Sequence, residues 1–375
     1  MFTNESRFPM SCVALAVSSL VLVSQKVSAR LRRKTLLVFF LAVITIACDD
    51  KQQAQNVKSK PKRLQTVTIN NIEPRRDVAG KIIDAHGGCL QFFKGRYYLY
   101  GTAFGTNENS LAVNCPFRVY SSPDLEQWTY EGELLKERPD GVYFRPCVVY
   151  NSHTRKYVLW YNWFPKLWNG QTAVATSDTP LGPFTIVNPD VRILGSRPGD
   201  GSLFMDDDGT GYYIYTAIGE GYAVRVERLT PDCLEPSGEM SNILVKGGEA
   251  PVLFQRNNLY YALCGPLCPD CLNGSVVQVL TAPSPLGPYT ARANINRRPE
   301  NDAPIIPAQQ TWVARIPMAG EPLFVWMGDR WGSCPDGIKG HDFQFWSAPL
   351  NFSPDGDILP IENIGRWDIT WVWGD

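Results

Sequence analysis

Nearly the same nine residues occur twice in this chain, at residues 177–185 and 282–290. Both copies contain the string Pro-Leu-Gly-Pro, followed by an aromatic residue and Thr. A weaker relative at residues 121–128 stands one unit earlier. The period of roughly 50 to 60 residues is the length of a propeller blade. The repeat therefore predicts a chain built from successive copies of one small unit.

Five segments share a turn signal followed by alternating aromatic and β-branched residues, which is the pattern of a half-buried antiparallel strand. They lie at residues 94–100, 154–160, 208–215, 256–261 and 318–326. No stretch after residue 64 has the pattern of a long amphipathic helix. Short, evenly spaced strands favour a closed all-β array over a sandwich. We predict an all-β fold, a five-bladed β-propeller, over residues 65–375.

The charge of the chain is almost balanced, with 36 Lys and Arg against 37 Asp and Glu. This balance leaves no basic face for nucleic acid and no acidic block. The 11 Trp and 16 Tyr favour a neutral, ring-shaped ligand, although most aromatic residues of a propeller pack between blades. No linker interrupts residues 65–375, so we expect a single domain preceded by a tail.

The N-terminal region has the pattern of a secretion signal, with a basic cluster at residues 30–34 before an apolar run at residues 35–47. The run is too short to span a bilayer, which argues against a transmembrane anchor. We expect residues 1–48 to be a signal segment of the lipoprotein type. Residues 49–64, which are polar and aperiodic, are expected to form a flexible tether.

The last four residues of that segment, 45–48, resemble a bacterial lipobox, in which Cys48 would carry the lipid. Thr45 stands where Leu is usual. We therefore expect an exported protein, in the periplasm or at the cell surface, that touches a membrane only through a lipid at Cys48.

Eight of the ten cysteines lie beyond the leader, and export would permit disulfides. Cys264, Cys268 and Cys271 lie close together in a turn-rich stretch. A zinc site needs a fourth ligand, yet the chain has three His and no second Cys-x-x-Cys pair. A disulfide or a free thiol is therefore favoured over a metal. We expect no metal site and no required cofactor.

Three polar residues stand at equivalent places, at the inner start of the third, fourth and fifth units. They are Asp200, Glu249 and Gln309. In a propeller the strands nearest the axis carry functional groups at one end of the central channel. These three side chains are therefore expected to converge there. The acidic run at residues 206–209 is better explained as a solvated hairpin turn.

Glu249 has no helix to cap and no turn to close, because it stands between Gly-Gly and Ala-Pro ahead of an apolar strand. In a channel beside a second carboxylate, burial and like charge would raise its pKa and keep it protonated as a general acid. Asp200 is the natural partner, since cleavage of a glycosidic bond uses a pair of carboxyl groups. The alternative is an ion pair between Glu249 and Arg145 or Arg197.

Five short elements occur in an order known from one family: Ala-His-Gly-Gly at 85–88, Asp200, Glu249-Ala-Pro, Gln309-Gln-Thr and Gly-Asp-Arg-Trp at 328–331. Over residues 78–370 the chain resembles glycoside hydrolase family 43, in particular the branch that contains the exo-β-1,3-galactanases. The resemblance implies a five-bladed propeller and hydrolysis with inversion. It also implies Glu249 as the general acid and Asp200 as the residue that orients it and tunes its pKa.

The identity of the general base stays open. Most of the wider family places an Asp at the inner start of the first unit, whereas the galactanase branch uses a Gln at the position of Gln309. An ordinary amide is a very poor base, so this role requires the imidic acid tautomer or a proton relay. Asp84 and His86 are rivals, since either can accept a proton from water. A structural role, in contact with His341, is the alternative for His86.

Sugar binding is expected to involve side chains around the channel mouth. The galactanases carry Glu before the Arg-Pro of the second unit, whereas here Phe144 precedes Arg145, so the identity of the cleaved sugar stays open. Several Trp residues, including Trp168, either stack on a sugar or pack between blades, and Arg330 can bind hydroxyl groups. The candidate substrate-binding residues are Asp84, His86, Phe144, Arg145, Trp163, Trp312, Arg330 and Trp331.

The leading functional hypothesis is an inverting hydrolase that trims a β-linked galactan or a related plant or algal polysaccharide. An arabinofuranosidase or xylosidase is the alternative within the family. A non-catalytic glycan-binding propeller is the alternative outside enzymes. The presence of both Asp200 and Glu249 favours an enzyme.

Overall fold

The computed structural model describes residues 63–109, 111–167, 169–267 and 271–373. The expected signal segment at 1–48, with Cys48, lies outside the described residues, as does the expected tether up to residue 62. Within the described part, no helix has both the length and the apolar character needed to cross a bilayer.

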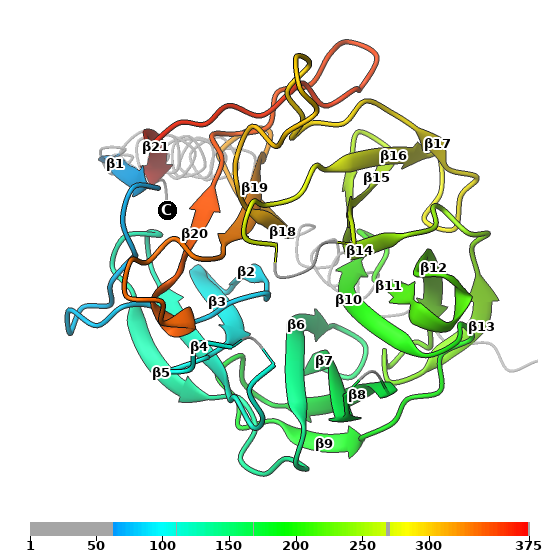
Figure 1. The fold of residues 1–375 in the computed structure, drawn as a ribbon. Coiled ribbons are helices and arrows are strands. Elements are labelled where there is room, and N and C mark those ends of the chain that lie inside the picture. Colours follow the sequence, from blue (N-terminus) through cyan, green and yellow to red (C-terminus); the bar gives the residue numbers. More distant parts are fainter. Residues whose placement is uncertain (1–62, 110, 168, 268–270, 374–375) are drawn as a thin grey trace, which may run out of the picture. The chain divides into compact units, whose positions relative to one another are not determined.

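Five small antiparallel sheets stand around a common axis, as predicted, and form a five-bladed β-propeller (Figure 1). Each sheet is one blade and follows chain order from the axis outward. Blade one contains β2 (Leu90–Phe93), β3 (Arg96–Thr102), β4 (Phe117–Ser122) and β5 (Thr129–Glu133); blade two contains β6 (Val142–Asn151), β7 (Lys156–Lys166), β8 (Asn169–Ser177) and β9 (Thr185–Asn188). Blade three contains β10 (Pro198–Met205), β11 (Gly211–Ala217), β12 (Ala223–Leu229) and β13 (Pro236–Met240); blade four contains β14 (Gly248–Arg256), β15 (Leu259–Pro266), β16 (Gln278–Ala282) and β17 (Thr290–Ala291). Blade five contains β18 (Gln309–Ile316), β19 (Leu323–Arg330) and β20 (Phe343–Trp346). Two short 3₁₀ helices lie between strands: η1 (Ile218–Glu220) follows β11, and η2 (Lys339–His341) follows β19.

The sequence repeats mark equivalent corners of the blades. The two nonapeptides join the third strand to the outer strand in blades two and four, and the weaker copy at 121–128 does the same in blade one. The five aromatic segments each include the start of the second strand of a blade, namely β3, β7, β11, β15 and β19. The innermost strands, which carry the candidate catalytic residues, come just before these segments.

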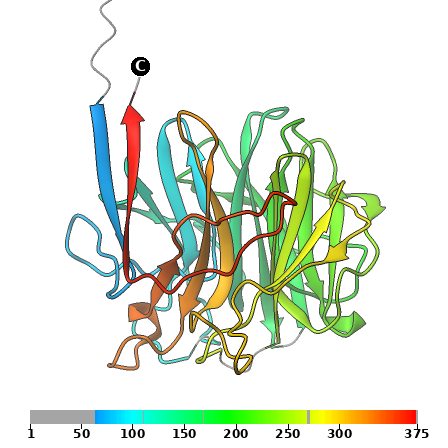
Figure 2. The ribbon, with the colours of Figure 1, turned by 90° about the horizontal axis from the view of Figure 1, so that it is seen from above.

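The two ends of the domain close the ring. The terminal strands β1 (Arg63–Asn70) and β21 (Arg366–Trp373) pair with each other and lie side by side in Figure 2. The side chain of Asn71 then donates to the carbonyl of Trp346 in blade five and accepts from its N–H, both over 2.9 Å. Asp77 forms a bridge with Trp128 in blade one. The segment after β1 therefore links the last blade to the first.

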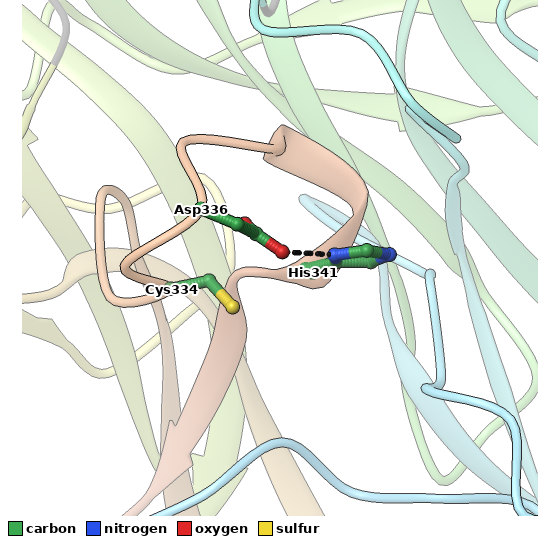
Figure 3. A group of neighbouring side chains, drawn as sticks. All are labelled: Cys334, Asp336 and His341. Carbon is green, nitrogen blue, oxygen red and sulfur yellow. Dashed lines mark hydrogen bonds and ion pairs between the residues drawn. The ribbon is translucent and has the colours of Figure 1, made fainter.

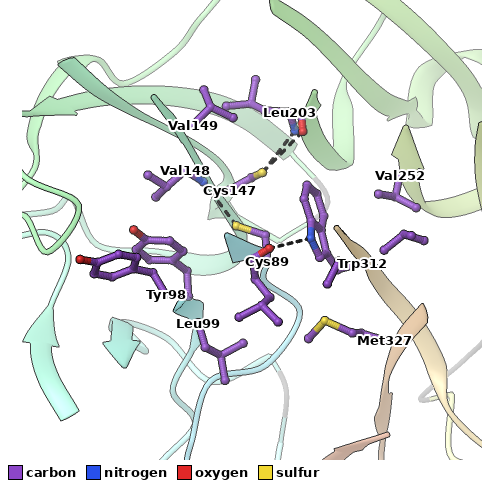
Figure 4. Packing of buried hydrophobic residues seen from close by; sticks show 14 of the residues in the cluster. Cys89, Tyr98, Leu99, Cys147, Val148, Val149, Leu203, Val252, Trp312 and Met327 are labelled. Carbon is purple, nitrogen blue, oxygen red and sulfur yellow. Dashed lines mark hydrogen bonds between the residues drawn. The ribbon is translucent and has the colours of Figure 1, made fainter. Parts of the chain in front are cut away.

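The core lies where the inner strands meet, and each blade contributes to it. Cys89, just before β2, packs with Cys147, Leu203, Val252 and Trp312 from the four other inner strands (Figure 4). The N–H of Leu203 lies 3.4 Å from Cys147 Sγ, and Trp312 Nε1 donates to the carbonyl of Leu90 over 3.0 Å. These polar contacts join neighbouring blades and satisfy groups that burial would otherwise leave unpaired.

Candidate active site

The inner strands change register where they reach the candidate site. The pairing shifts at residues 144–147 in β6, 198–201 in β10, 249–252 in β14 and 310–312 in β18. Pro146 and Pro251 lack the N–H that a regular ladder needs, which accounts for two of the four shifts. The residues before them, Arg145 and Ala250, have positive φ angles of 54° and 52°. Such irregularities turn side chains away from the regular sheet face and are common beside active sites.

The turned side chains meet in one cavity of about 510 Å³. All three candidate catalytic residues, Asp200, Glu249 and Gln309, line it. Four of the candidate substrate-binding residues line it as well: His86, Phe144, Arg145 and Trp331. Four of the five blades thus contribute a candidate catalytic or binding residue through the start of their inner strand, and blade one contributes His86 from the segment before β2.

Gln309 connects Glu249 to Trp331 by two hydrogen bonds. Gln309 Nε2 donates to Glu249 Oε1 over 2.7 Å, and Trp331 Nε1 donates to Gln309 Oε1 over 2.9 Å. An indole N–H can only donate, so Trp331 determines which end of the amide is the oxygen. The amide nitrogen must then face Glu249. The amide is held in one orientation from both sides.

Asp200 is held by Arg145 and in turn holds the backbone beside Glu249. Arg145 Nη2 lies 2.9 Å from Asp200 Oδ2, and the N–H of Ala250 donates to the same oxygen over 3.1 Å. Arg145 also donates to the carbonyl of Gln310 over 3.2 Å. The expected alternative, an ion pair between Glu249 and Arg145, is therefore not what the structure shows, because the partner of Arg145 is Asp200. Arg197, the other candidate cation, is exposed.

His86 is buried between two carboxylates. Its Nδ1 lies 3.4 Å from Asp329 Oδ1, and its Nε2 lies 3.5 Å from Asp84 Oδ1. Burial by itself lowers the pKa of His86, but the interaction with Asp329 and the charges of Asp329, Asp84 and Asp342 outweigh it, so the pKa is raised above 6.5. His341 does not meet His86; it contacts Asp336 over 2.6 Å.

Four candidate binding residues do not line the cavity. Asp84 accepts the N–H groups of Phe104 and Gly105 and pairs with Arg118, and Trp163 donates to the carbonyl of Pro189. Trp312 lies in the core, and Arg330 donates to the carbonyl of Asn71 and covers the ring of Phe343. These four residues support the fold around the site. Trp168 lies outside the described residues.

Several cavity residues were not among the sequence candidates. The apolar ones include Phe104, Phe164, Tyr222 and Leu267, and Lys339 adds a cation whose Nζ lies 4.1 Å from the centre of the Trp331 ring. All come from loops or strand ends away from the inner-strand positions. In sequence they look like ordinary blade aromatics or loop residues, so no local signal distinguishes them.

Among the cysteines considered earlier, Cys264 is a buried free thiol and Cys271 is disulfide-bonded. Cys268 lies outside the described residues. Cys271 Sγ lies 3.4 Å from Glu249 Oε1. A disulfide sulfur has no proton, so this contact packs against the acid without donating to it. In the described part of the chain, the three side chains that converge like metal ligands lie elsewhere, on the loop after β19.

The amino-acid sequence matches a known family. The model of glycosyl hydrolases family 43 matches residues 93–314, which is more than half of the chain. The chain belongs to glycosyl hydrolase family 43. Its resemblance to the branch of the exo-β-1,3-galactanases is supported by solved structures. A family 43 β-1,3-galactosidase has a TM-score of 0.69 and is 25% identical, with 81% of this chain and 64% of that one covered.

The chain is similar to two further proteins of known name. The crystal structure of an exo-β-1,3-galactanase from Clostridium thermocellum is 27% identical, with a TM-score of 0.69 and coverage of 80% of this chain and 66% of that chain. The arabinoxylan arabinofuranohydrolase of Bacillus subtilis is 24% identical over an aligned length of 323, and the alignment covers 72% of this chain and 60% of that protein. The chain thus spans about three fifths of that relative's length.

Proposed function

We propose that this protein is an exported, inverting glycoside hydrolase that removes sugar from the end of a β-linked galactan or a related polysaccharide. One observation carries the proposal: Asp200, Glu249 and Gln309, from three different blades, line a single cavity. Membership of family 43 supports glycosidic bond cleavage as the reaction.

Glu249 is the general acid in this proposal. It donates its proton to the oxygen of the leaving sugar as the glycosidic bond breaks. Asp200 is a positioning residue, because it accepts the N–H of Ala250, the residue directly after the acid. Arg145 balances the charge of Asp200 and keeps it in place. Asp200 thus acts on Glu249 through the backbone, and neither gives nor takes a proton in the reaction.

Gln309 is the residue that directs the attacking water in this proposal. In inverting enzymes the acid and the base are roughly 6.5 to 9.5 Å apart, so that a sugar and a water fit between them. Here Gln309 Nε2 is 2.7 Å from Glu249. The base role therefore requires this bond to open when a sugar enters. Gln309 Oε1, still oriented by Trp331, can then accept a hydrogen bond from the attacking water. The amide relays the proton that this water loses to solvent.

The choice of a β-galactan rests on the structures that the chain resembles, whose names give β-1,3-galactosidase and exo-β-1,3-galactanase. The cavity wall contains Phe144, packed edge-on against Phe164, in the place where the galactanases carry Glu. An apolar ring favours the face of a sugar over its hydroxyl groups. The curated relative, an arabinofuranohydrolase, favours arabinose as the second candidate.

The deciding experiment incubates the purified protein with β-1,3-galactan, arabinoxylan and xylan and follows released sugar by NMR. We expect galactose, appearing first as the α anomer, because inversion of a β linkage gives the α product. Arabinose release would select the second candidate. Binding to a glycan without release of sugar would contradict the hydrolase and support a glycan-binding propeller.

Export and lipidation form a separate part of the proposal. They rest on the basic and apolar pattern ahead of Cys48. Expression of the full chain in a bacterium should give a membrane-associated protein whose mature N-terminus is lipidated Cys48, as read by mass spectrometry. Cys48→Ala should remain unlipidated. An intact, unprocessed N-terminus on the wild-type protein would contradict this part without touching the hydrolase.

A further inference from the structure

The loop between β19 and β20 carries three side chains that can bind a metal: Cys334, Asp336 and His341. The sulfur, one carboxylate oxygen and one imidazole nitrogen all lie within 4.8 Å of one another. Asp336 Oδ2 and His341 Nδ1 are 2.6 Å apart. Figure 3 shows the carboxylate between the imidazole and the thiol in that view. None of the three lines the cavity of the candidate active site.

The backbone of this loop is fixed by hydrogen bonds that do not use those three ligand atoms. The carboxylate of Asp342 accepts the N–H of Gly332 over 2.8 Å and that of Cys334 over 3.0 Å. Asp336 uses its other oxygen, Oδ1, to accept the N–H of Ile338 over 3.0 Å. Gly337 makes the tight turn with a φ of 75°, which side chains disfavour. The backbone of the three residues is thus set before any ion arrives, and an ion would take the place of the bond between Asp336 and His341.

The charges at the cluster suit a divalent cation. The carboxylate of Asp336 supplies a negative charge, and the sulfur of Cys334 and one nitrogen of His341 lie within 4.8 Å of it. The contact between Asp336 and His341 does not by itself explain why the sulfur of Cys334 lies beside them. A cation would neutralise Asp336 and stabilise Cys334 as the thiolate.

We propose that Cys334, Asp336 and His341 form a zinc site with a fourth position open to water. A set of thiolate, imidazole and carboxylate ligands binds zinc in preference to calcium or magnesium. Cys334 would lose its proton to solvent, and His341 would bind through Nδ1 with its proton on Nε2. One proton is released for each ion bound, and no electrons are transferred.

A zinc ion here would stabilise one wall of the cavity. The same loop carries Trp331 and Lys339, which line the cavity, and η2 runs from Lys339 to His341. Trp331 in turn orients the amide of Gln309. A bound ion would join the two arms of the loop behind these residues, and so limit their motion.

Cobalt(II) is the sharpest probe, because a thiolate ligand gives it a charge-transfer absorption in the near ultraviolet. We expect the full chain, purified free of metal, to show this band with one cobalt per chain and to lose it when zinc is added. Cys334→Ser should lose the band. His341→Ala should weaken binding by more than about tenfold. Circular dichroism checks that both variants are folded.

His153→Ala is the matched control, because His153 is exposed on another part of the surface, and it should bind cobalt as the wild type does. A band of wild-type intensity in Cys334→Ser would assign the metal to a different thiol and overturn the proposal. So would the lack of any band in the wild-type protein. Neither result would bear on Glu249 or on hydrolysis.

Discussion

Gln309 Nε2 donates a hydrogen bond to Glu249 Oε1 over 2.7 Å, across the boundary between blades five and four. The contact joins the two residues that an inverting mechanism must keep apart. The acid and the amide are therefore paired in this structure, and a sugar has to displace that pairing. Changes at Glu249 test proton donation, and changes that free the amide of Gln309 test the activation of water.

Glu249→Gln removes the proton donor while keeping the shape of the side chain. We expect kcat on a natural polysaccharide to fall by about 10²- to 10⁴-fold. A dinitrophenyl glycoside should lose far less, because its leaving group departs without protonation. Release of sugar and of dinitrophenol measures both rates. Glu321→Gln, at an exposed site, is the control. Equal losses on both substrates would remove the acid role from Glu249.

Trp331→Phe keeps an aromatic ring but deletes the N–H that orients Gln309. The amide can then rotate, so kcat should fall by about fivefold while KM changes little, since one neutral hydrogen bond contributes about 1 kcal/mol. Steady-state kinetics on the released sugar test this. Trp163→Phe loses a similar bond to Pro189 outside the cavity. It should cost stability and leave kcat unchanged; a drop in kcat there would argue against the specific role of Trp331.

Arg145→Met breaks the pair with Asp200, whose side chain is 22% exposed. Leaving this carboxylate without its partner should lower the free energy of unfolding by about 2 kcal/mol and reduce kcat, because Asp200 no longer holds Ala250 in place. Urea denaturation and kinetics measure the two effects. Arg228→Met breaks an exposed pair with Glu239, and we expect less than about 1 kcal/mol there. Similar losses of unfolding free energy in both variants would show that the pair between Arg145 and Asp200 stabilises the protein no more than an exposed ion pair does.

His86 should make stability depend on pH. Its pKa in the folded protein is raised above 6.5, so the stability that protonated His86 contributes is fully present below about pH 6.5 and is lost as the pH rises through the folded pKa. In His86→Gln this contribution is absent. The gap in unfolding free energy between wild type and variant should therefore narrow with rising pH, as read from urea denaturation.

The exposed His153 again provides the comparison, since His153→Gln should follow the wild-type curve at every pH. A gap between wild type and His86→Gln that stays constant from about pH 5 to about pH 9 would mean that His86 does not change its charge in the fold over this range.

The blade architecture was predictable because its signals are local. The nonapeptide copies and the aromatic strand patterns report strand pairing within one blade, and the structure places them at equivalent corners and in the second strands. The positions of Asp200, Glu249 and Gln309 at inner strand starts followed from the same period. Phe164, Tyr222 and Lys339 had no such signal, because their place in the cavity depends on how loops of different blades fold over it.

The amino-acid sequence by itself determined the number of blades, the family and the order of the polar residues along the inner strands, because strand alternation and turn residues act over a few neighbours. Only the tertiary structure decided that Arg145 pairs with Asp200, that Trp331 orients Gln309, and that Cys334 and His341 meet. These contacts join blades or close a loop. They depend on ring closure and on the register shifts of the inner strands, which no local pattern specifies.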